Sequence, residues 1–338
     1  MILIFTIEHD ISTTNVIKWL DYFEEEVIRM NADDDLHKFE EINSEGIFFR
    51  NILTNKVFNL LDAKACWWRR RGISKSCFTD LKKEDTLING TFDLTSLING
   101  DNNLINKEVN DLIDFIYYQV YKNCKINIGR PTFNVNKLIV NEMAEKHGLR
   151  IPAFKIARNN HQIASFNKRN TGLISKAISN GVYNTIGNHR FYSYTELIED
   201  ELLEKRKEVN FFPSLIMEKV EKKSEIRTFY LDGQFYSMAI FSQSSDQTKV
   251  DFRKYNNKKP NKTEPYKLPK NTEDKLVKLF NELDLNCGSV DLIIDTKGDY
   301  IFLEINPVGQ YGMVSDPCNY NLDKRIAKYL INGSFKEN

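Results

Sequence analysis

The sequence predicts a mixed α/β protein, and three patterns support this fold class. The chain opens with an apolar strand, an amphipathic helix and a second strand, its last third holds two tight hairpins, and apolar stripes at helical spacing lie between these parts. At 338 residues the chain is long enough for two or three packed subdomains, because single hydrophobic cores stop growing at roughly 250 to 300 residues.

The first third of the chain predicts a small α/β domain. Residues 1–7 are expected to form a buried strand, Ser12 to cap the following helix, and residues 27–30 to form a second strand. A helix with apolar positions on one face between residues 109 and 120 then leads to the end of this domain near Cys124.

The middle of the chain predicts alternating helices and strands. A helix is expected from Asn136 to Gly148, where glycine suits the left-handed residue that ends many helices. Ile151-Pro152 opens a strand, and residues 173–178 form another. The Lys/Glu-rich residues 199–209 are expected to be a solvated helix or excursion.

Two hairpins mark the last third of the chain. Asp232-Gly233 stands between two apolar runs and is one of the strongest short-range hairpin signals. Residues 289–295 and 300–306 flank a second loop, in which Gly298 can take the positive φ that the turn needs. The hairpins are separated by a helical stripe of Leu276, Leu279, Phe280 and Leu283.

Composition excludes several classes of protein. Lys and Arg together number 47, as do Asp and Glu, so bulk attraction to nucleic acid is not expected. The apolar N-terminus lacks the basic segment of a signal peptide, and no apolar run approaches the roughly 20 residues of a membrane span. The cysteines form no C-x-x-C pair and predict reduced thiols in a cytoplasmic protein. They are Cys66, Cys77, Cys124, Cys287 and Cys318.

The second hairpin is expected to bring oxygen ligands together. If Asp295 pairs with Tyr300 around the loop, Asp291 lies directly across from Glu304, and Asn306 follows on the same face. Facing carboxylates repel one another unless a cation lies between them. Mg²⁺ prefers such hard oxygen ligands and completes its coordination with phosphates and water. The alternative is the exposed polar face of a surface hairpin.

The chain here contains Val290-Asp291-Leu292 followed by Phe302-Leu303-Glu304-Ile305-Asn306-Pro307. These strings resemble the metal-binding signature of the ATP-grasp superfamily. The resemblance implies an ATP-grasp fold with an N-terminal α/β pre-ATP-grasp domain, ATP and Mg²⁺ as cofactors, and Asp291, Glu304 and Asn306 as metal ligands. The implied domains are residues 1–124 for the pre-ATP-grasp domain, 125–215 for the central ATP-grasp subdomain, and 216–338 for the C-terminal subdomain with hinge, substrate pair and metal site.

Lysines that could neutralise phosphate charge follow the order of the ATP-grasp pattern. Lys137 precedes the strand that starts at Ile151-Pro152, and Lys176 lies in the next strand. Taken singly, each lysine is more often a solvated surface residue, and only their order supports the assignment. The hinge expected to meet adenine follows, with Ile216 packing on the ring. Its residues are Met217, Glu218, Lys219 and Val220.

Glu225 and Arg227 belong to the same pattern. They lie at positions i and i+2 of a strand and therefore share one face. The resemblance assigns Glu225 to the nucleotide site and Arg227 to the phosphates or the acyl phosphate. An ordinary surface ion pair is the alternative.

The layout resembles the peptide maturases that close ester or amide macrocycles in ribosomally made peptides, the microviridin or graspetide type. The similarity covers most of the chain, and the opening looks most like the grasp-with-spasm branch. It implies a precursor peptide with a leader and an acidic, hydroxyl-rich core as substrate, and a SPASM-domain partner protein, and it leaves a homodimer open. No role follows for Arg69 to Arg71. Strings that carry the similarity include Trp67-Trp68-Arg69-Arg70, Asn136-Lys137-Leu138 and Glu225-Ile226-Arg227.

Asp251-Phe252-Arg253 is similar to the Asp-x-Arg pair with which these maturases engage the acidic core of the peptide. In an extended segment both side chains share one face, so Arg253 can clamp the acceptor carboxylate while Asp251 orients the nucleophile. With Arg227, they are the expected catalytic residues. A solvated basic loop is the alternative.

Three functions are compatible with these patterns. The first is an ATP-dependent ligase that phosphorylates an Asp or Glu side chain of a precursor peptide and closes an ω-ester with Ser or Thr, or an ω-amide with Lys. The second applies the same ADP-forming, acyl-phosphate chemistry to a free amino acid or small peptide. The third is a binding protein without turnover, against which the intact acidic set argues.

Overall fold

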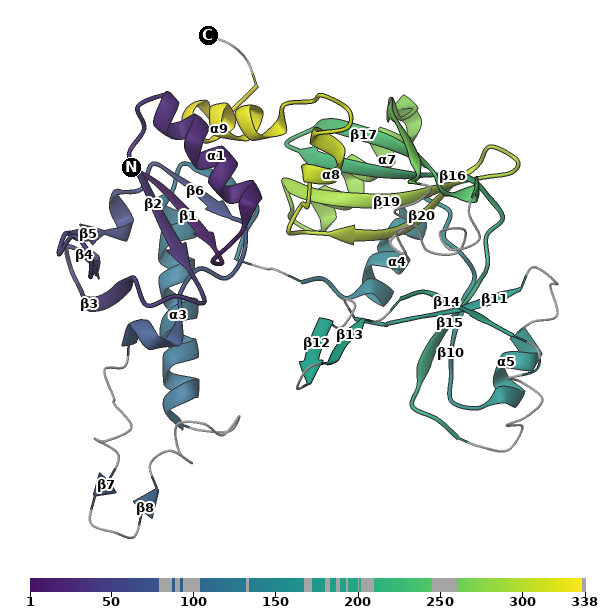
Figure 1. Ribbon diagram of the computed structural model, residues 1–338, viewed down its shortest axis with the longest axis horizontal. Coiled ribbons are helices and arrows are strands. Elements are labelled where there is room, and N and C mark those ends of the chain that lie inside the picture. The colour runs from purple at the N-terminus through teal and green to yellow at the C-terminus, as the bar shows by residue number, and fades with distance from the viewer. Residues whose placement is uncertain are drawn as a thin grey trace. The chain divides into compact units, whose positions relative to one another are not determined.

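The computed structural model describes residues 1–78, 87–88, 92–93, 104–131, 134–166, 172–179, 183–186, 189–192, 194–199, 201, 210–244 and 260–335. The mixed α/β fold class is confirmed (Figure 1). The chain forms two compact units, Met1–Phe133 with Asn321–Asn338, and Asn134–Tyr320. The predicted boundaries at residues 124 and 215 remain predictions. No helix within the described ranges is long and apolar enough to cross a bilayer.

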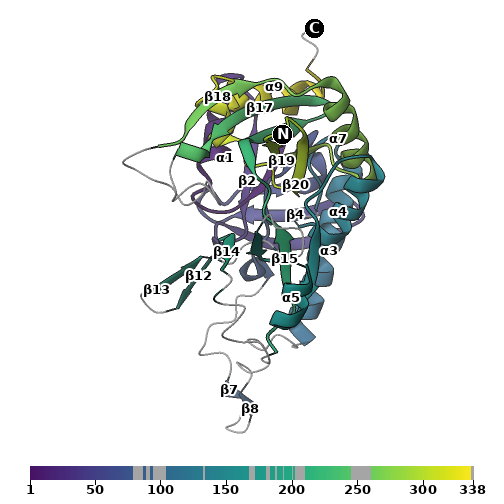
Figure 2. The same ribbon diagram turned by 90° about the vertical axis from the view of Figure 1, so that its right-hand side faces the viewer.

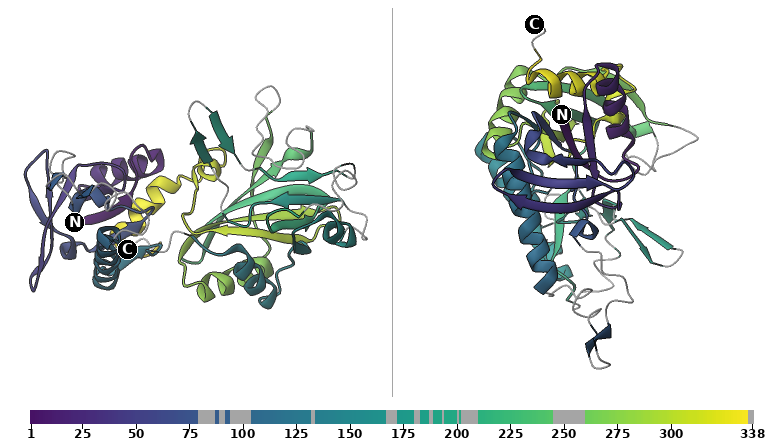
Figure 3. Two further views of the ribbon diagram at one scale, coloured as in Figure 1. Left: turned by 90° about the horizontal axis from the view of Figure 1, so that it is seen from below. Right: turned by 90° about the vertical axis from the view of Figure 1, so that its left-hand side faces the viewer.

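A parallel sheet in the order β2-β1-β6-β9 forms the centre of the first unit. Its strands are β1 (Ile2–Thr6), β2 (Val27–Asn31), β6 (Ala65–Trp68) and β9 (Ile126–Ile128). Helix α3 (Leu104–Asn123) covers one face, while α1 (Ile11–Tyr22) and α9 (Leu322–Asn332) pack against each other (Figure 3, right). An antiparallel sheet adjoins them, with strands β3 (His37–Asn43), β4 (Gly46–Asn51) and β5 (Val57–Asn59).

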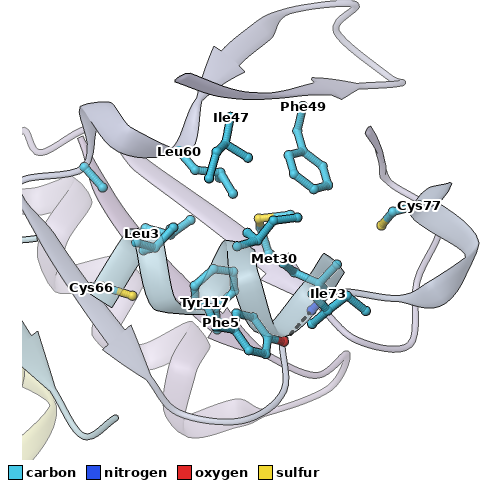
Figure 4. Close-up of a cluster of buried hydrophobic side chains, with 14 of the residues drawn as sticks. Leu3, Phe5, Met30, Ile47, Phe49, Leu60, Cys66, Ile73, Cys77 and Tyr117 are labelled. Carbon is cyan, nitrogen blue, oxygen red and sulfur yellow. Dashed lines mark hydrogen bonds between the residues drawn. The ribbon is translucent and has the colours of Figure 1, made fainter. Parts of the chain in front are cut away.

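The core of the first unit explains why this segment folds as predicted. Leu3 and Phe5 of β1 alternate toward the same face as Cys66 and Trp68 of β6, and Tyr117 of α3 packs against them (Figure 4). The α3 residues between positions 109 and 120 are buried on one side, as their spacing predicted.

The start of α1 differs from the prediction. Asp10, and not Ser12, is the N-cap residue, and its Oδ1 accepts a hydrogen bond from the backbone N of Thr13 at 3.2 Å. A carboxylate at this position also interacts favourably with the positive end of the helix. The helix therefore begins at Ile11, and Ser12 lies inside its first turn.

The second unit contains an antiparallel sheet in the order β18-β17-β16-β19-β20. Helices α4 (Lys137–Lys146) and α7 (Lys270–Glu282) pack on one of its faces over a large apolar cluster (Figure 2; Figure 3, left). The short helix α8 (Gly312–Ser315) contacts the sheet at β16 and β17. The strands are β16 (Lys222–Leu231), β17 (Gln234–Phe241), β18 (Lys262–Tyr266), β19 (Cys287–Asp295) and β20 (Tyr300–Asn306).

A smaller sheet of the second unit has the order β10-β15-β11-β14. Helix α5 (Asn160–Phe166) packs on one face of it through Ile163 and Phe166. A separate hairpin is formed by β12 (Tyr183–Ile186) and β13 (His189–Tyr192). The strands of the small sheet are β10 (Phe154–Ala157), β11 (Leu173–Lys176), β14 (Glu196–Ile198) and β15 (Ser214–Glu218).

Several predicted turns of the second unit are confirmed. Asp232 and Gly233 both have positive φ, 44° and 84°, as a type I′ hairpin requires. Gly298 has φ 92° in the loop between β19 and β20, and Gly148 has φ 76° after α4. The predicted excursion at residues 199–209 falls largely outside the described residues.

Candidate active site

The hairpin of β19 and β20 places Asp291 directly opposite Glu304, as predicted. The register near the loop was predicted wrongly, because Ile294 and not Asp295 pairs with Tyr300. A β-bulge next to Leu292 then shifts the register by one residue. Without the bulge Asp291 would face Leu303. The bulge therefore brings both carboxylates to the same place along the hairpin.

Asp291 is held by a buried arginine from the neighbouring strand. Arg227 pairs with Asp291 in the register of β16 and β19, and its Nη1 donates to Oδ1 at 2.8 Å and to Oδ2 at 2.7 Å. The two side chains are 7% and 15% exposed. The Nε of Arg227 is buried and has no hydrogen-bond partner within the described part of the chain, which is unusual for so strong a donor.

Glu304 is contacted by both predicted lysines. Its Oε2 lies 2.7 Å from the Nζ of Lys176 on β11 and 3.1 Å from the Nζ of Lys137 at the start of α4. Burial alone would raise the pKa of Glu304, but Lys176 and Lys137 outweigh burial and hold this pKa well below its ordinary value. Three separate elements thus converge on one carboxylate.

The position of Lys137 follows from the sequence of its helix. Asn136 is the N-cap residue of α4, and its Oδ1 accepts hydrogen bonds from the backbone N atoms of Leu138 and Ile139. Lys137 is therefore the first residue of the helix. Val140 and Ala144 on the buried side of α4 anchor the helix on the five-stranded sheet.

A second buried ion pair lies on β16 beside Arg227. The Oε1 of Glu225 accepts from the Nζ of Lys222 at 2.6 Å and from the Oγ of Ser242 at 2.8 Å. Burial raises the pKa of Glu225, with Lys222 and Ser242 opposing this shift and Asp291 adding to it. No sequence pattern indicated Lys222 or Ser242 as partners of Glu225. Lys222 and Glu225 are three residues apart, and in a regular strand such residues point to opposite faces. A bulge between Lys222 and Ser224 brings the two side chains to the same face.

The face of the small sheet that carries Lys176 also carries apolar side chains, of which Leu215 and Met217 are buried. Lys176 pairs with Leu215, and Ile174 pairs with Met217, so these side chains share one face. The prediction for Ile216 is wrong. Ile216 points to the opposite face and packs with Ile163 of α5, because side chains alternate along β15.

Two amides of the predicted hinge already have backbone partners. Glu218 N donates to Ala153 O at 2.9 Å, and Lys219 N donates to Gly172 O at 3.0 Å. The Lys219 side chain pairs with Glu221 at 2.7 Å. These two amides are therefore already used within the small sheet, and adenine binding by residues 217–220 remains a prediction.

The donor set fits a magnesium ion that also binds phosphate. Asp291 and Glu304 face each other, and Asn306 follows Glu304 by two residues on the same face. No group of three or more His, Cys, Asp and Glu residues suited to a metal occurs in the described ranges. A site with two carboxylates, an amide and phosphate oxygens suits Mg²⁺ better than a cage built from protein alone. Magnesium ligation by these residues remains a proposal.

The loop after β20 is shaped by Asn306 and Gly309. The Oδ1 of Asn306 accepts from the backbone N of Val308 at 3.0 Å, and Gly309 has φ 64°. A Cβ at Gly309 would lie 3.1 Å from the Cys287 sulfur, so glycine suits this close approach. The predicted pair Asp251 and Arg253 lies outside the described residues.

A model of the RimK-like ATP-grasp domain matches residues 134–330, which is more than half of the chain. Solved structures with a similar fold match almost the whole chain. The macrocyclase MdnC bound with precursor peptide MdnA, from Microcystis aeruginosa MRC, has a TM-score of 0.75 at 23% identity, over 99% of this chain and 100% of that chain. A RiPP-associated ATP-grasp ligase from Chryseobacterium gregarium, in complex with ADP and a leader and core peptide, has a TM-score of 0.77 at 22% identity, over 98% and 97%.

The ATP-grasp ligase PsnB, complexed with a minimal precursor, Mg and ADP, has a TM-score of 0.68 at 14% identity, over 98% of this chain and 96% of that chain. At such identities the likeness concerns the fold, and it confirms the predicted ATP-grasp fold. No curated protein sequence matches the chain significantly.

Proposed function

This chain belongs to the RimK-like ATP-grasp family, and we propose that it is an ATP-dependent, ADP-forming ligase that acts on a ribosomally made precursor peptide. It phosphorylates an Asp or Glu side chain of the peptide, then closes an ω-ester with Ser or Thr, or an ω-amide with Lys. The similar structures that contain a precursor peptide support this substrate class. The opening of the chain favours the grasp-with-spasm branch, with a SPASM-domain partner.

One observation carries the proposal. Lys137, Lys176 and Arg227 come from three different elements, and each contacts one of the two facing carboxylates, Asp291 and Glu304. Cations and hard oxygen ligands in one place are what the transfer of a phosphoryl group requires. A binding protein without turnover has no need of this arrangement.

The cations stabilise the charge that develops on the phosphates. Lys137 and Lys176 lie together and act as point charges, and the guanidinium of Arg227 adds a third cation beside Asp291. Asp291, Glu304 and Asn306 would hold magnesium, which would supply charge neutralisation at the phosphate oxygens. Leu215 and Met217, which are buried on the Lys176 side of the small sheet, would supply apolar contacts to the adenine ring.

The reaction balances without a protein nucleophile. An oxygen of the peptide carboxylate forms a bond to the γ-phosphorus, and the bond to the β-γ bridging oxygen breaks, so ADP leaves. The hydroxyl or amine of the peptide then attacks the acyl carbon, and phosphate departs with the electron pair while the attacking group loses its proton. We assign Arg253 to the acceptor carboxylate and Asp251 to the nucleophile.

Mass spectrometry tests the proposal directly. The chain is incubated with ATP, Mg²⁺ and a candidate precursor peptide rich in Thr, Ser, Asp and Glu, and each closed ring should remove the mass of one water. A ligase for free amino acids or small peptides would release phosphate with such substrates and leave the precursor unchanged. Asp291→Ala should abolish phosphate release, and equal release from this variant and the parent would refute the site.

A further inference from the structure

The parallel sheet of the first unit has a topological switch point between β1 and β6. From β1 the chain passes to β2 on one side, whereas β6 lies on the other side and is followed by β9. The segments that leave the carboxyl ends of β1 and β6 therefore diverge. Open α/β sheets bind ligands in the crevice at such a point.

Three charged side chains meet at this place. Asp10 follows β1 and caps α1, while Arg69 and Arg70 follow β6 directly. The Oδ2 of Asp10 accepts from the Nε of Arg69 at 3.1 Å, and its Oδ1 accepts from the backbone N of Thr13. The Asp10 and Arg69 side chains are only 7% and 3% exposed, so Arg69 provides the structural counter-ion of the helix cap.

Arg70 has no such structural role. Its Nε lies 3.9 Å from Asp10 Oδ2, which is beyond hydrogen-bond distance, and this buried Nε has no partner in the described part of the chain. The side chain is 33% exposed, so its outer edge is accessible. Within the described part of the chain, these two guanidinium groups share the carboxylate of Asp10 as an ion-pair partner. Burial and the neighbouring Arg69 lower the pKa of Arg70, while Asp10 opposes this shift.

The segment that carries Arg70 is held firmly by its backbone. Arg70 N donates to Phe5 O at 2.8 Å, and Gly72 N donates to the Oη of Tyr117 at 3.2 Å. The same Oη accepts from Ile73 N at 3.3 Å (Figure 4). A Cβ at Gly72 would lie 2.5 Å from the Cα of Phe5, so only glycine allows this close packing. A fixed backbone lowers the entropy cost of binding by the side chain.

We propose that Arg70 is the centre of an oxyanion site at the switch point of the first unit, and that the anion is a side-chain carboxylate of the acidic precursor peptide. The peptide as occupant rests on the proposed function. The two Nη atoms on the accessible edge of a planar guanidinium match the two oxygens of a carboxylate, and Arg69 and Arg70 share the single carboxylate of Asp10, which favours one further anionic group. A phosphate group has the same chemistry, so the experiment must separate the two sources.

The test compares Arg70→Gln with Arg71→Gln. Both remove one positive charge from neighbouring positions, but Arg71 is exposed. Binding of a fluorescently labelled acidic precursor peptide is measured by anisotropy, and the KM for ATP is measured alongside. We expect Arg70→Gln to weaken peptide binding about ten- to a hundred-fold, as the loss of a charge-assisted hydrogen bond implies, and Arg71→Gln to change it less than about three-fold.

Peptides with single Asp→Asn or Glu→Gln changes identify the partner. One such change should weaken binding to the parent but not to Arg70→Gln, so the two effects should be non-additive. Additive effects for every acidic residue would overturn the proposal, as would equal peptide binding by parent and Arg70→Gln. A raised KM for ATP with unchanged peptide binding would assign the site to a nucleotide phosphate and also overturn it.

Failure of this proposal can be told apart from failure of the proposed function. Dehydration of the precursor by the parent, followed by mass spectrometry, reports on the function alone. A parent that dehydrates the peptide while Arg70→Gln binds it normally refutes only the oxyanion site. A parent that neither binds nor dehydrates the peptide refutes both. Thermal melts of the two variants that match the parent show that lost binding is not lost folding.

Discussion

Glu304→Gln should change nucleotide affinity in opposite directions with and without magnesium. The Glu304 carboxylate contacts the ammonium groups of Lys176 and Lys137 at 2.7 and 3.1 Å. Because the proposed site uses these lysines for phosphate, a bare carboxylate competes with phosphate for them. When no metal is present, removing the Glu304 charge should strengthen nucleotide binding. When magnesium is present, the same change removes a proposed ligand of the metal.

The expected magnitudes follow from charge and distance. At an effective dielectric constant of about 20, two unit charges about 4 Å apart interact by roughly 4 kcal/mol. The Glu304 side chain is 20% exposed, and solvent screening reduces this value, so we expect ATP to bind about ten-fold more tightly in EDTA. With Mg²⁺, loss of one charged group at the phosphates should lower the rate of phosphate release by about 10²- to 10³-fold.

Glu282→Gln is a matched control. Glu282 also bridges two basic groups, with Lys146 at 2.6 Å and His147 at 2.5 Å, but it lies on α7 and faces α4 away from the proposed site. Equilibrium binding of a fluorescent ATP analogue is measured for the parent and both variants, in EDTA and in excess Mg²⁺. Weaker binding of the analogue to Glu304→Gln in EDTA, or parent-like phosphate release in Mg²⁺, would refute the reasoning.

Two further predictions concern the same groups. Lys176→Met should raise the KM for ATP by roughly ten- to a hundred-fold in steady-state assays, because a charged hydrogen bond is worth about 1.5 to 3 kcal/mol, whereas Lys146→Met should leave it unchanged. The lowered pKa of Glu304 predicts a stabilising contribution that is fully present above the unfolded-state pKa of about 4.3 and is lost as the pH falls toward the folded-state pKa. Denaturant unfolding between pH 6 and 3 should therefore show a steeper loss of stability for the parent than for Glu304→Gln, and parallel curves would contradict this explanation.

The pairing of Asp291 with Glu304 was predictable from the sequence, although its cause was not. Counting residues around the loop gave the correct partners because two departures from the assumed geometry cancel. Tyr300 pairs with Ile294, which lies one residue further from the loop than Asp295, and the bulge beside Leu292 restores the count. A bulge depends on the packing of both strands, which residue types alone do not determine.

Only the resemblance to the ATP-grasp pattern indicated that Lys137, Lys176 and Glu304 lie close together. Glu304 is separated from each lysine by more than a hundred positions, and no local pattern fixes their distance. The error for Ile216 has a simpler cause. Periodicity predicts that alternate residues of a strand share a face, but it does not say which face is covered by α5. Lys222 was missed because a bulge places it beside Glu225 against the expected alternation.

The ion pairs of the site have a consequence for binding. Each proposed metal ligand with a charge contacts a cation that is also a proposed phosphate ligand, Asp291 with Arg227 and Glu304 with Lys137 and Lys176. A metal that binds alone must displace these cations from the carboxylates, and a nucleotide that binds alone must compete with the carboxylates. When both bind, the cations move to phosphate oxygens and the carboxylates to the metal, so no buried charge is left without a partner. Metal and nucleotide should therefore bind with positive coupling, which by linkage is equal in both directions.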